Sequence, residues 1–133
     1  MGTGITIKEA SEQLGIPAHT IRHYDKEGLI PFLGRDEHGN RIFKPQDVEW
    51  IKLMTCFRVT GMPIIQLKKI VDLALQGEST LESRKQILEQ HKEELNKRQR
   101  ELDLAFEAVN RKLERYREIQ KGTTSEESAF RME

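Results

Sequence analysis

Apolar positions near the N-terminus recur at helical spacing and predict a short first helix. Ile7, Ala10 and Leu14 fall on one face of it. Thr6, with Glu9 three residues later, forms a capping box at its start, in which each side chain satisfies a backbone N–H of the other residue. A glycine directly after Leu14 predicts the end of this helix.

A second short helix follows a tight turn. Pro17 is predicted in its first turn, where a missing N–H costs nothing. Ile21 is expected to face the first helix, whereas a polar set lies on or near the outer side: His19, Thr20, Arg22, His23 and Lys26. Two helices around a glycine-containing turn, the second polar outside, form the helix-turn-helix pattern, whose second helix fits a DNA major groove.

Residues 32–44 have the pattern of a β-hairpin. The run Glu37-His38-Gly39-Asn40 supplies turn residues between two short extended segments. Arg35, Arg41 and Lys44 on this hairpin are predicted to reach DNA phosphates beside the groove; for Arg41, a salt bridge within the head is the alternative. The whole predicts a winged helix-turn-helix.

Two further helices are predicted after the hairpin. They begin at Pro45 and Pro63 and end at Gly61 and Gly77. Their apolar residues are expected to complete the core of the head: Val48, Ile51, Leu53, Met54, Phe57, Val59, Ile64, Leu67, Ile70, Val71, Ala74 and Leu75.

Residues 78–121 predict one long helix. Ser79 and Glu82 form a second capping box, and no helix breaker follows until Gly122. Apolar residues recur every seven positions: Leu81, Leu88, Leu95, Leu102, Val109 and Tyr116. A second, poorer apolar row accompanies them and includes Leu113. Such heptads are typical of a coiled coil. The predicted organisation is a mainly α chain with a head (1–77), a coiled-coil dimerisation helix (78–121) and a disordered, Ser/Thr/Glu-rich tail (122–133).

Composition changes this picture in three ways. The chain has 133 residues, 6% aromatic, with 22 basic and 22 acidic side chains, so its core is modest and a partner subunit is expected. Residues 1–77 hold ten Lys/Arg and nine Asp/Glu, so DNA binding must depend on where cations are placed. One cysteine, no signal peptide and no membrane-spanning run predict a cytoplasmic protein without a disulfide or a membrane partner.

The motifs in the head resemble those of the MerR family of bacterial transcription regulators. The resemblance rests on Thr20-Ile21-Arg22-His23-Tyr24-Asp25, on the Gly28-Leu29 that follows, and on Gly39-Asn40-Arg41-Ile42-Phe43. The family usually has Tyr, Glu and Tyr where this chain has His23, Asp25 and Phe43. The similarity continues through the following helices and covers roughly residues 5–121.

The resemblance implies a homodimer in which the long helices pair antiparallel, and a promoter-DNA partner whose spacer is over-long. Bending and untwisting that spacer would act on RNA polymerase indirectly, as an activator of a detoxification or stress operon. The DNA-contacting residues implied are His19, Thr20, Arg22, His23 and Tyr24 in the second helix and Arg35, Arg41 and Lys44 in the wing. Tyr24 has an alternative as a core residue with a wet hydroxyl. A repressor remains the alternative to an activator.

Cys56 has two interpretations. Free cysteines are among the most buried residues, and its late position in a helix disfavours a thiolate, so a packing role is the simpler prediction. Lys52 and Arg58 are cations close in sequence that would favour a reactive thiol. The resemblance includes a single-cysteine branch of the family that responds to aldehydes and other small electrophiles, which implies a sensor thiol. A regulator independent of this cysteine stays open.

Other classes of function have weaker support. His19 and His23 have i, i+4 spacing suited to zinc, but no third ligand is evident and one thiol makes no selective metal site, so no metal and no cofactor are predicted. No nucleophile–base pair, phosphate loop or paired carboxylates indicate an enzyme. A coiled-coil adaptor that binds protein is the remaining rival.

Overall fold

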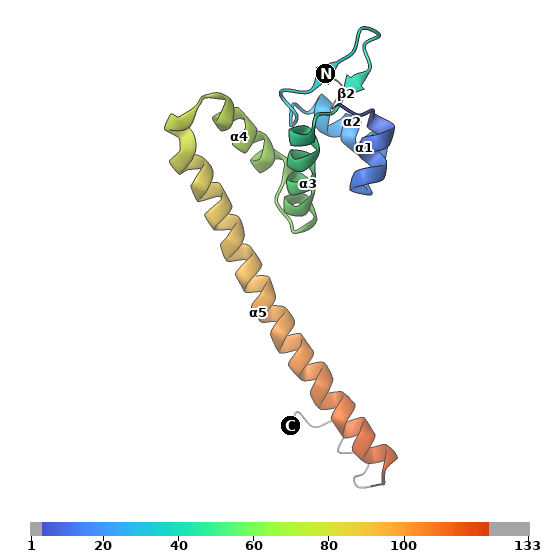
Figure 1. The fold of residues 1–133 in the computed structure, drawn as a ribbon. Helices are drawn as coiled ribbons and strands as arrows, with labels where there is room; N and C mark the ends of the chain where they lie inside the picture. Colours follow the sequence, from blue (N-terminus) through green and yellow to red (C-terminus); the bar gives the residue numbers. More distant parts are fainter. Residues whose placement is uncertain (1–3, 123–133) are drawn as a thin grey trace. The chain divides into compact units, whose positions relative to one another are not determined.

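A computed structural model describes residues 4–122 of the chain. The elements, labelled in Figure 1, are α1 (Ile7–Leu14), α2 (Ala18–Lys26), β1 (Gly34–Arg35), β2 (Arg41–Ile42), α3 (Pro45–Val59), α4 (Ile64–Leu75), a 3₁₀ helix η1 (Glu78–Thr80) and α5 (Leu81–Gln120). The protein is therefore mainly helical, as predicted. It divides into two compact units between Glu89 and Gln90. The predicted tail lies, apart from its first residue, outside the described residues.

The capping box at the start of α1 is confirmed. The Thr6 hydroxyl accepts the backbone N–H of Glu9 at 3.1 Å, and the Glu9 carboxylate accepts the backbone N–H of Thr6 at 3.1 Å. Gly15 ends α1 in the left-handed conformation, with φ of 68°. Pro17 lies one residue before α2, and Pro63 likewise precedes α4, so neither proline is inside the first turn. Their extended backbones make them the capping residues instead.

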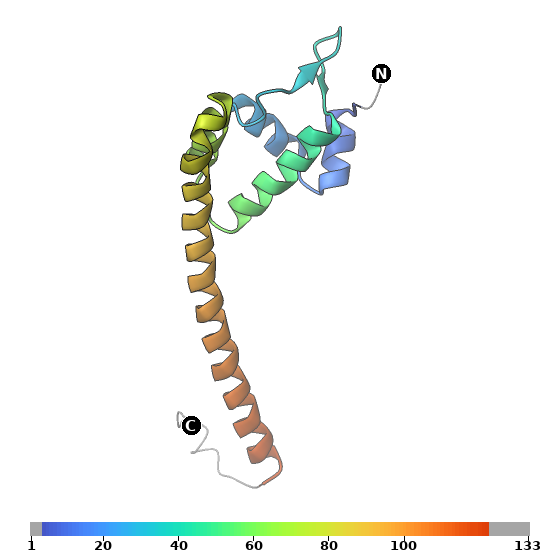
Figure 2. The ribbon, with the colours of Figure 1, turned by 60° about the vertical axis from the view of Figure 1, so that its left-hand side comes forward.

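The predicted hairpin is also present. Strands β1 and β2 are antiparallel, with Gly34 opposite Ile42 and Arg35 opposite Arg41. In the connecting loop the Asp36 carboxylate accepts the backbone N–H groups of His38 at 2.9 Å and Asn40 at 2.8 Å. In Figure 2 the hairpin extends beyond the helices of the head.

The N-terminal segment adds a contact that the sequence did not predict. Ile5 and Phe43 exchange both backbone hydrogen bonds, each at 2.8 Å, which joins the chain before α1 to the residue after β2. This bridge ties the base of the hairpin to the start of α1.

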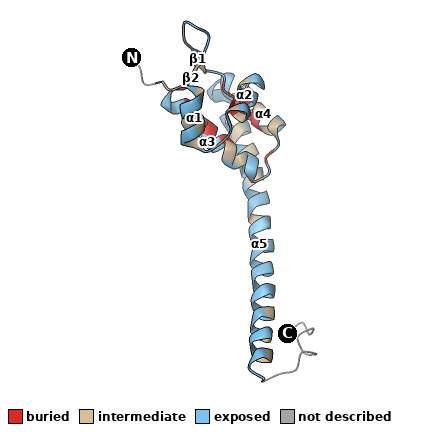
Figure 3. Ribbon diagram, turned by 90° about the vertical axis from the view of Figure 1, so that its right-hand side faces the viewer, coloured by how far each residue is buried: buried red, intermediate tan, exposed pale blue. Residues whose placement is uncertain are grey.

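One hydrophobic core occupies the head. Its largest fully buried side chains come from α2, α3, α4 and the hairpin region: Phe43, Ile21, Leu29, Ile51, Met54 and Leu67. The indole N–H of Trp50 donates to the carbonyl of Leu29 at 2.7 Å, which joins α3 to the segment after α2. Buried residues, red in Figure 3, occur in the head and not along α5.

Four predicted core residues are instead exposed. Leu53 is 48%, Val59 77% and Leu75 53% accessible, and Ala74 is exposed as well. Apolar residues are spread around α3, and only the faces carrying buried residues such as Ile51 and Met54 pack on the core.

The predicted capping box at Ser79 is wrong. Residues 78–80 form the 3₁₀ helix η1, and α5 begins at Leu81. The neighbouring Thr80 is buried, and its hydroxyl donates to the carbonyls of Leu73 at 2.6 Å and Gly77 at 2.8 Å. Arg84 Nε donates to the Thr80 hydroxyl at 3.1 Å, and Arg84 Nη2 to the Gly77 carbonyl at 3.2 Å. The hydroxyl that organises this junction is one residue later than predicted.

The long helix is present as α5, with 40 residues and none of them buried. The residues of the predicted heptad stripe are all accessible, from 36% at Leu95 to 59% at Leu102, and Leu113 in the companion row is 43% accessible. Within residues 4–122 no helix has both the length and the apolar character needed to cross a membrane.

Candidate nucleic-acid interface

The outer face of α2 presents four polar side chains to solvent. His19, Arg22, His23 and Lys26 are exposed, as predicted, while Ile21 on the opposite face is completely buried. None of the four has a side-chain hydrogen bond or ion pair with any other residue between 4 and 122. Together with Arg41, they line a shallow hollow of about 310 Å³. These donors are therefore free to bind another molecule.

A larger open groove, of about 850 Å³, lies between the start of α1, α2 and the hairpin. Five cationic residues and one carboxylate are among those that line it: Lys8, Arg22, Arg35, Arg41, Lys44 and Asp36. The residues 1–77 carry almost balanced charge, so this concentration of cations is a property of the fold. A cation-lined groove is suited to a polyanion.

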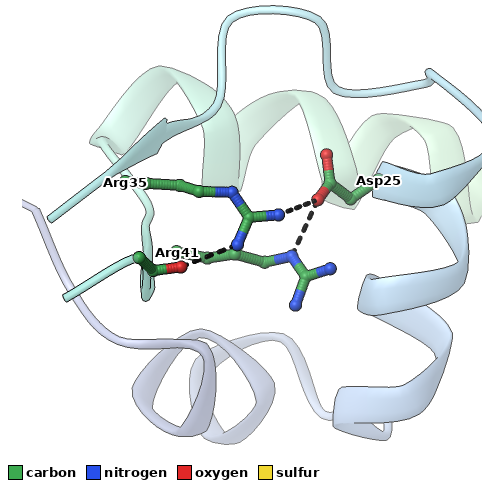
Figure 4. Close-up of polar contacts among 4 residues, drawn as sticks. Asp25, Arg35 and Arg41 are labelled. Carbon is green, nitrogen blue, oxygen red and sulfur yellow. Dashed lines mark hydrogen bonds and ion pairs between the residues drawn. The ribbon is translucent and has the colours of Figure 1, made fainter.

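Asp25 connects α2 to the hairpin through two arginines (Figure 4). Its Oδ2 atom lies 2.7 Å from Nε of Arg41 and 3.4 Å from Nη2 of Arg35. The Arg35 guanidinium also donates through Nη1 to the carbonyl of Gly39 at 2.8 Å. The side chains of Asp25 and Arg41 are only 19% and 21% accessible, whereas that of Arg35 is 51% accessible. Both wing arginines therefore have an internal partner, and for Arg41 the salt bridge within the head is present.

The other predicted contact residues differ in how exposed they are. Tyr24 is 6% accessible and belongs to the core, which agrees with the alternative weighed for it, and Thr20 is half-buried. Lys44 is exposed, and its ammonium has no partner within the described part of the chain. Its backbone N–H is bound by the Asp47 carboxylate at 2.9 Å, which caps α3.

Two functional candidates were missed by the sequence analysis. Lys8, in the first turn of α1, lines the groove and is exposed. Asp25 was noted only as a replacement for the family's glutamate, and its pairing with Arg41, sixteen residues away, has no local sequence signal. An acidic residue in an otherwise basic helix face was the one available hint.

Cys56 is exposed on α3, so the first of its two interpretations, a small buried hydrophobe, is wrong. Its backbone carbonyl accepts both the N–H of Thr60 at 3.2 Å and the Thr60 hydroxyl at 2.8 Å. Arg58 is held elsewhere, since Nη1 donates to the carbonyl of Met62 at 3.1 Å. Cys56 is therefore accessible to solvent in the single chain.

The histidines of α2 have no metal-binding environment around them. Across residues 4–122, no three His, Cys, Asp or Glu side chains are grouped so that they could hold a metal ion. His19 and His23 instead share the hollow with Arg22, Lys26 and Arg41, a cationic setting that suits an anion.

Comparison with known proteins gives the family. Residues 5–74 match the model of the MerR HTH family regulatory proteins. An uncharacterised HTH-type transcriptional regulator of Haemophilus influenzae is 43% identical over 84 residues, which is 63% of this chain and 62% of that protein. The HTH-type transcriptional regulator AdhR of Bacillus subtilis is 34% identical over 91 residues, covering 68% of this chain and 65% of AdhR. The chain thus spans a little under two thirds of these curated relatives.

Solved structures agree over more of the chain. HiNmlR, a MerR family regulator lacking the sensor domain and crystallised bound to promoter DNA, superposes with a TM-score of 0.81 at 35% identity, covering 89% of this chain and 94% of HiNmlR. A MerR family transcriptional regulator from Bacillus thuringiensis superposes with a TM-score of 0.75 at 29% identity, over 85% and 99% of the two chains. This chain therefore belongs to the MerR family of helix-turn-helix, DNA-binding transcriptional regulators.

Proposed function

We propose that the protein is a homodimeric regulator that binds a promoter with α2 in the major groove and the hairpin on the flanking backbone, as a winged helix-turn-helix. The observation that carries this proposal is the exposed, unpartnered face of α2. Arg22 is the strongest candidate for reading bases, because its five guanidinium donors have no internal partner among residues 4–122. His19, Thr20, His23 and Lys26 would flank it.

Phosphate contacts would come from the groove beside α2. Lys8, Arg35 and Lys44 line it and are exposed. Arg41 would contribute mainly by holding the hairpin, because its Nε is bound to Asp25 and its side chain is four-fifths buried. Tyr24 would act through packing under α2.

Dimerisation is proposed through α5. The heptad residues Leu81, Leu88, Leu95, Leu102, Val109 and Tyr116, with Leu113, are accessible along a helix that has no fully buried residue. Its half-buried Ile87, outside this row, packs against the core of the head. An apolar row of this kind is stable in water when a second helix covers it. By family resemblance the two copies would pair antiparallel. The proposed organisation is then a DNA-binding head (1–77), a dimerisation helix (78–121) and a tail (122–133).

Regulation would follow from the geometry of the bound duplex. The paired α5 helices would hold the two heads at a fixed separation. The heads would then bind successive grooves of the duplex and keep the promoter spacer bent and untwisted. The energy needed to deform the DNA is offset by the extra phosphate contacts that the bend permits. Realignment of the two promoter hexamers would then assist RNA polymerase, which makes the protein an activator.

The trigger proposed is covalent modification of Cys56 by a small electrophile such as an aldehyde or a quinone. Its exposure supports this proposal, since a thiol must be reached before it can be modified. The thiolate would form a bond from sulfur to the electrophilic carbon, and the carbonyl oxygen would take up a proton. The added group on α3 would bias the head between two DNA-bound arrangements.

The central test is selection from a pool of random duplexes, followed by affinity measurements on the recovered operator. We expect enrichment of a dyad-symmetric site, and Arg22→Ala should weaken operator binding by about 1–3 kcal/mol. Arg100→Ala on α5, which removes the same charge from an exposed and unpartnered residue, is the control and should bind as the wild type does. Recovery of no sequence, with equal binding to every duplex, would favour a coiled-coil adaptor.

The trigger is tested by transcription in vitro from that promoter with formaldehyde, methylglyoxal or a quinone. The wild type should raise transcription on addition of inducer, and Cys56→Ser should not, while keeping its operator affinity. A Cys56→Ser protein that still responds excludes the thiol. Less transcript with the protein than without it, in the presence and absence of inducer, would identify a repressor.

A further inference from the structure

We propose that Asp25 divides the two wing arginines between different tasks: Arg41 fixes the hairpin on α2, and Arg35 exchanges its contact with Asp25 for a DNA phosphate. Asp25 is then a positioning residue that sets how many cations the wing offers to DNA. This inference rests on the proposed function, because it takes the hairpin to lie on the DNA backbone.

The first observation is that both guanidinium groups compete for one oxygen. Arg41 Nε is 2.7 Å from Oδ2 of Asp25, the length of a strong charge-assisted hydrogen bond, and both side chains are about four-fifths buried. Arg35 Nη2 is 3.4 Å from the same Oδ2, with half of its side chain exposed. A long, exposed ion pair contributes little to stability. The Asp25–Arg41 pair is therefore the permanent one, and the Asp25–Arg35 pair is exchangeable.

The second observation is that Arg35 stays positioned when it leaves Asp25. Its Nη1 donates to the carbonyl of Gly39 in the hairpin loop at 2.8 Å, a contact that does not involve the carboxylate. The remaining guanidinium donors then face a groove whose other lining cations include Lys8, Arg22 and Lys44. A phosphate entering this groove would replace one anionic oxygen by another at Nη2, so the exchange requires no unpaired charge.

The third observation is the site's charge. Loss of the Asp25 carboxylate would leave Arg35 and Arg41 as two uncompensated cations on the hairpin and would remove the bond that holds the hairpin on α2. Extra cations strengthen binding to any duplex, because phosphate contacts carry no sequence information. A loosened wing weakens the register that the operator requires. Asp25 is thereby a determinant of specificity and not only of stability.

The experiment measures the dependence of binding on salt for full-length Arg35→Gln, Arg41→Gln and Asp25→Asn, on operator and on random duplex. Two variants with the same charge changes on exposed residues of α5, Arg100→Gln and Asp103→Asn, are matched controls. Thermal unfolding of each protein reports whether the head remains folded. Each lost phosphate contact makes the slope of log K against log salt shallower by about 0.9, and a dimer loses two.

Arg35→Gln should make this slope shallower by nearly 2 for the dimer and leave the midpoint of thermal unfolding almost unchanged. Arg41→Gln should lower the midpoint by several degrees and weaken operator binding without that change in slope. Asp25→Asn should steepen the slope, tighten binding to random duplex severalfold and reduce the ratio of operator to random affinity at least threefold.

Three results would overturn the inference: equal changes in slope for Arg35→Gln and Arg41→Gln, no change in slope for Arg35→Gln, or an unaltered affinity ratio for Asp25→Asn. A wild-type protein that does not prefer its operator contradicts the proposed function itself. The wild-type measurement thus separates the two failures.

Discussion

The head and α5 use the same apolar residue types in opposite ways. Leu29 and Leu67 in the head are completely buried, whereas Leu102 and Val109 in α5 are 59% and 55% accessible. The head has one connected core, and α5 contains no buried residue along 40 residues. The start of α5 also contributes to this core, because the half-buried Ile87 packs against it. The heptad residues of α5 stay accessible within residues 4–122, as expected if a second copy covers them.

The head and α5 also differ in what their ion pairs connect. In the head, Asp25 on α2 pairs with Arg35 and Arg41 on the hairpin, and this cluster determines the position of the hairpin. On α5, by contrast, Arg111 pairs with Glu107 at 2.8 Å, one turn away, and both side chains are more than half exposed. Pairs of the second kind support a helix locally by a few tenths of a kcal/mol. The Asp25 cluster therefore shapes tertiary structure in the head, whereas the Arg111–Glu107 pair supports only local structure in α5.

The largest expected effect is on the core of the head. Phe43→Ala removes a fully buried ring and should lower the free energy of unfolding by about 3–5 kcal/mol, measured by urea denaturation at fixed protein concentration. Phe32→Ala is the control, since Phe32 is 75% accessible and its removal should change the free energy by less than about 0.5 kcal/mol. Equal losses would show that Phe32 is covered in solution, and the comparison of buried and exposed apolar residues would need revision.

Next in size is the effect of a charge in the seam of α5. Leu102→Glu should raise the dimer dissociation constant about 100-fold or more, because the carboxylate would be buried without a partner at a cost of roughly 3 kcal/mol. Leu104→Glu is the control: Leu104 is 66% accessible but lies outside the heptad row. Sedimentation of both proteins over a range of concentrations gives the constants. If Leu104→Glu dissociates the dimer and Leu102→Glu does not, the proposed seam is wrong.

A smaller effect is expected at the junction of α4 and α5. Thr80→Val keeps the side-chain volume but removes the hydroxyl that bonds to Leu73 and Gly77 and that accepts from Arg84. We expect a loss of about 1–2 kcal/mol in unfolding free energy, since buried polar partners lose their hydrogen bonds. Ser79→Ala removes the adjacent, exposed hydroxyl, which has no such contacts, and should be nearly neutral. Equal losses would restore the capping role first predicted for Ser79.

Local elements of the head were predictable because their signals lie within a few residues. Thr6 and Glu9 satisfy each other one turn apart, and Gly15 adopts a left-handed conformation that favours glycine. The junction before α5 was misplaced for the same reason. Serine and threonine are both residue types that commonly cap helices, and whether the hydroxyl of Ser79 or of Thr80 is buried depends on packing between α4 and the start of α5.

The candidate site was predictable in part. The outward residues of α2 follow from helical spacing once Ile21 faces the core. The different roles of the two wing arginines could not be predicted from spacing. They depend on how close each comes to the Asp25 carboxylate on α2, which is 2.7 Å for Arg41 and 3.4 Å for Arg35. Exposure of Cys56 was likewise beyond the sequence, since apolar residues surround α3 and its pattern does not say which face packs.

The sequence by itself determined the family, the order of the helices and hairpin, the exposed face of α2 and the apolar row of α5 that repeats every seven residues. Each of these depends on residue type and on spacing within one element. Only the tertiary structure decided that Tyr24 is core, that Cys56 is open to solvent, and that Asp25 holds Arg41 closely and Arg35 loosely. The reason is that burial and ion pairing depend on contacts between side chains that are far apart in the sequence. A pattern within one helix or strand carries no information about such contacts.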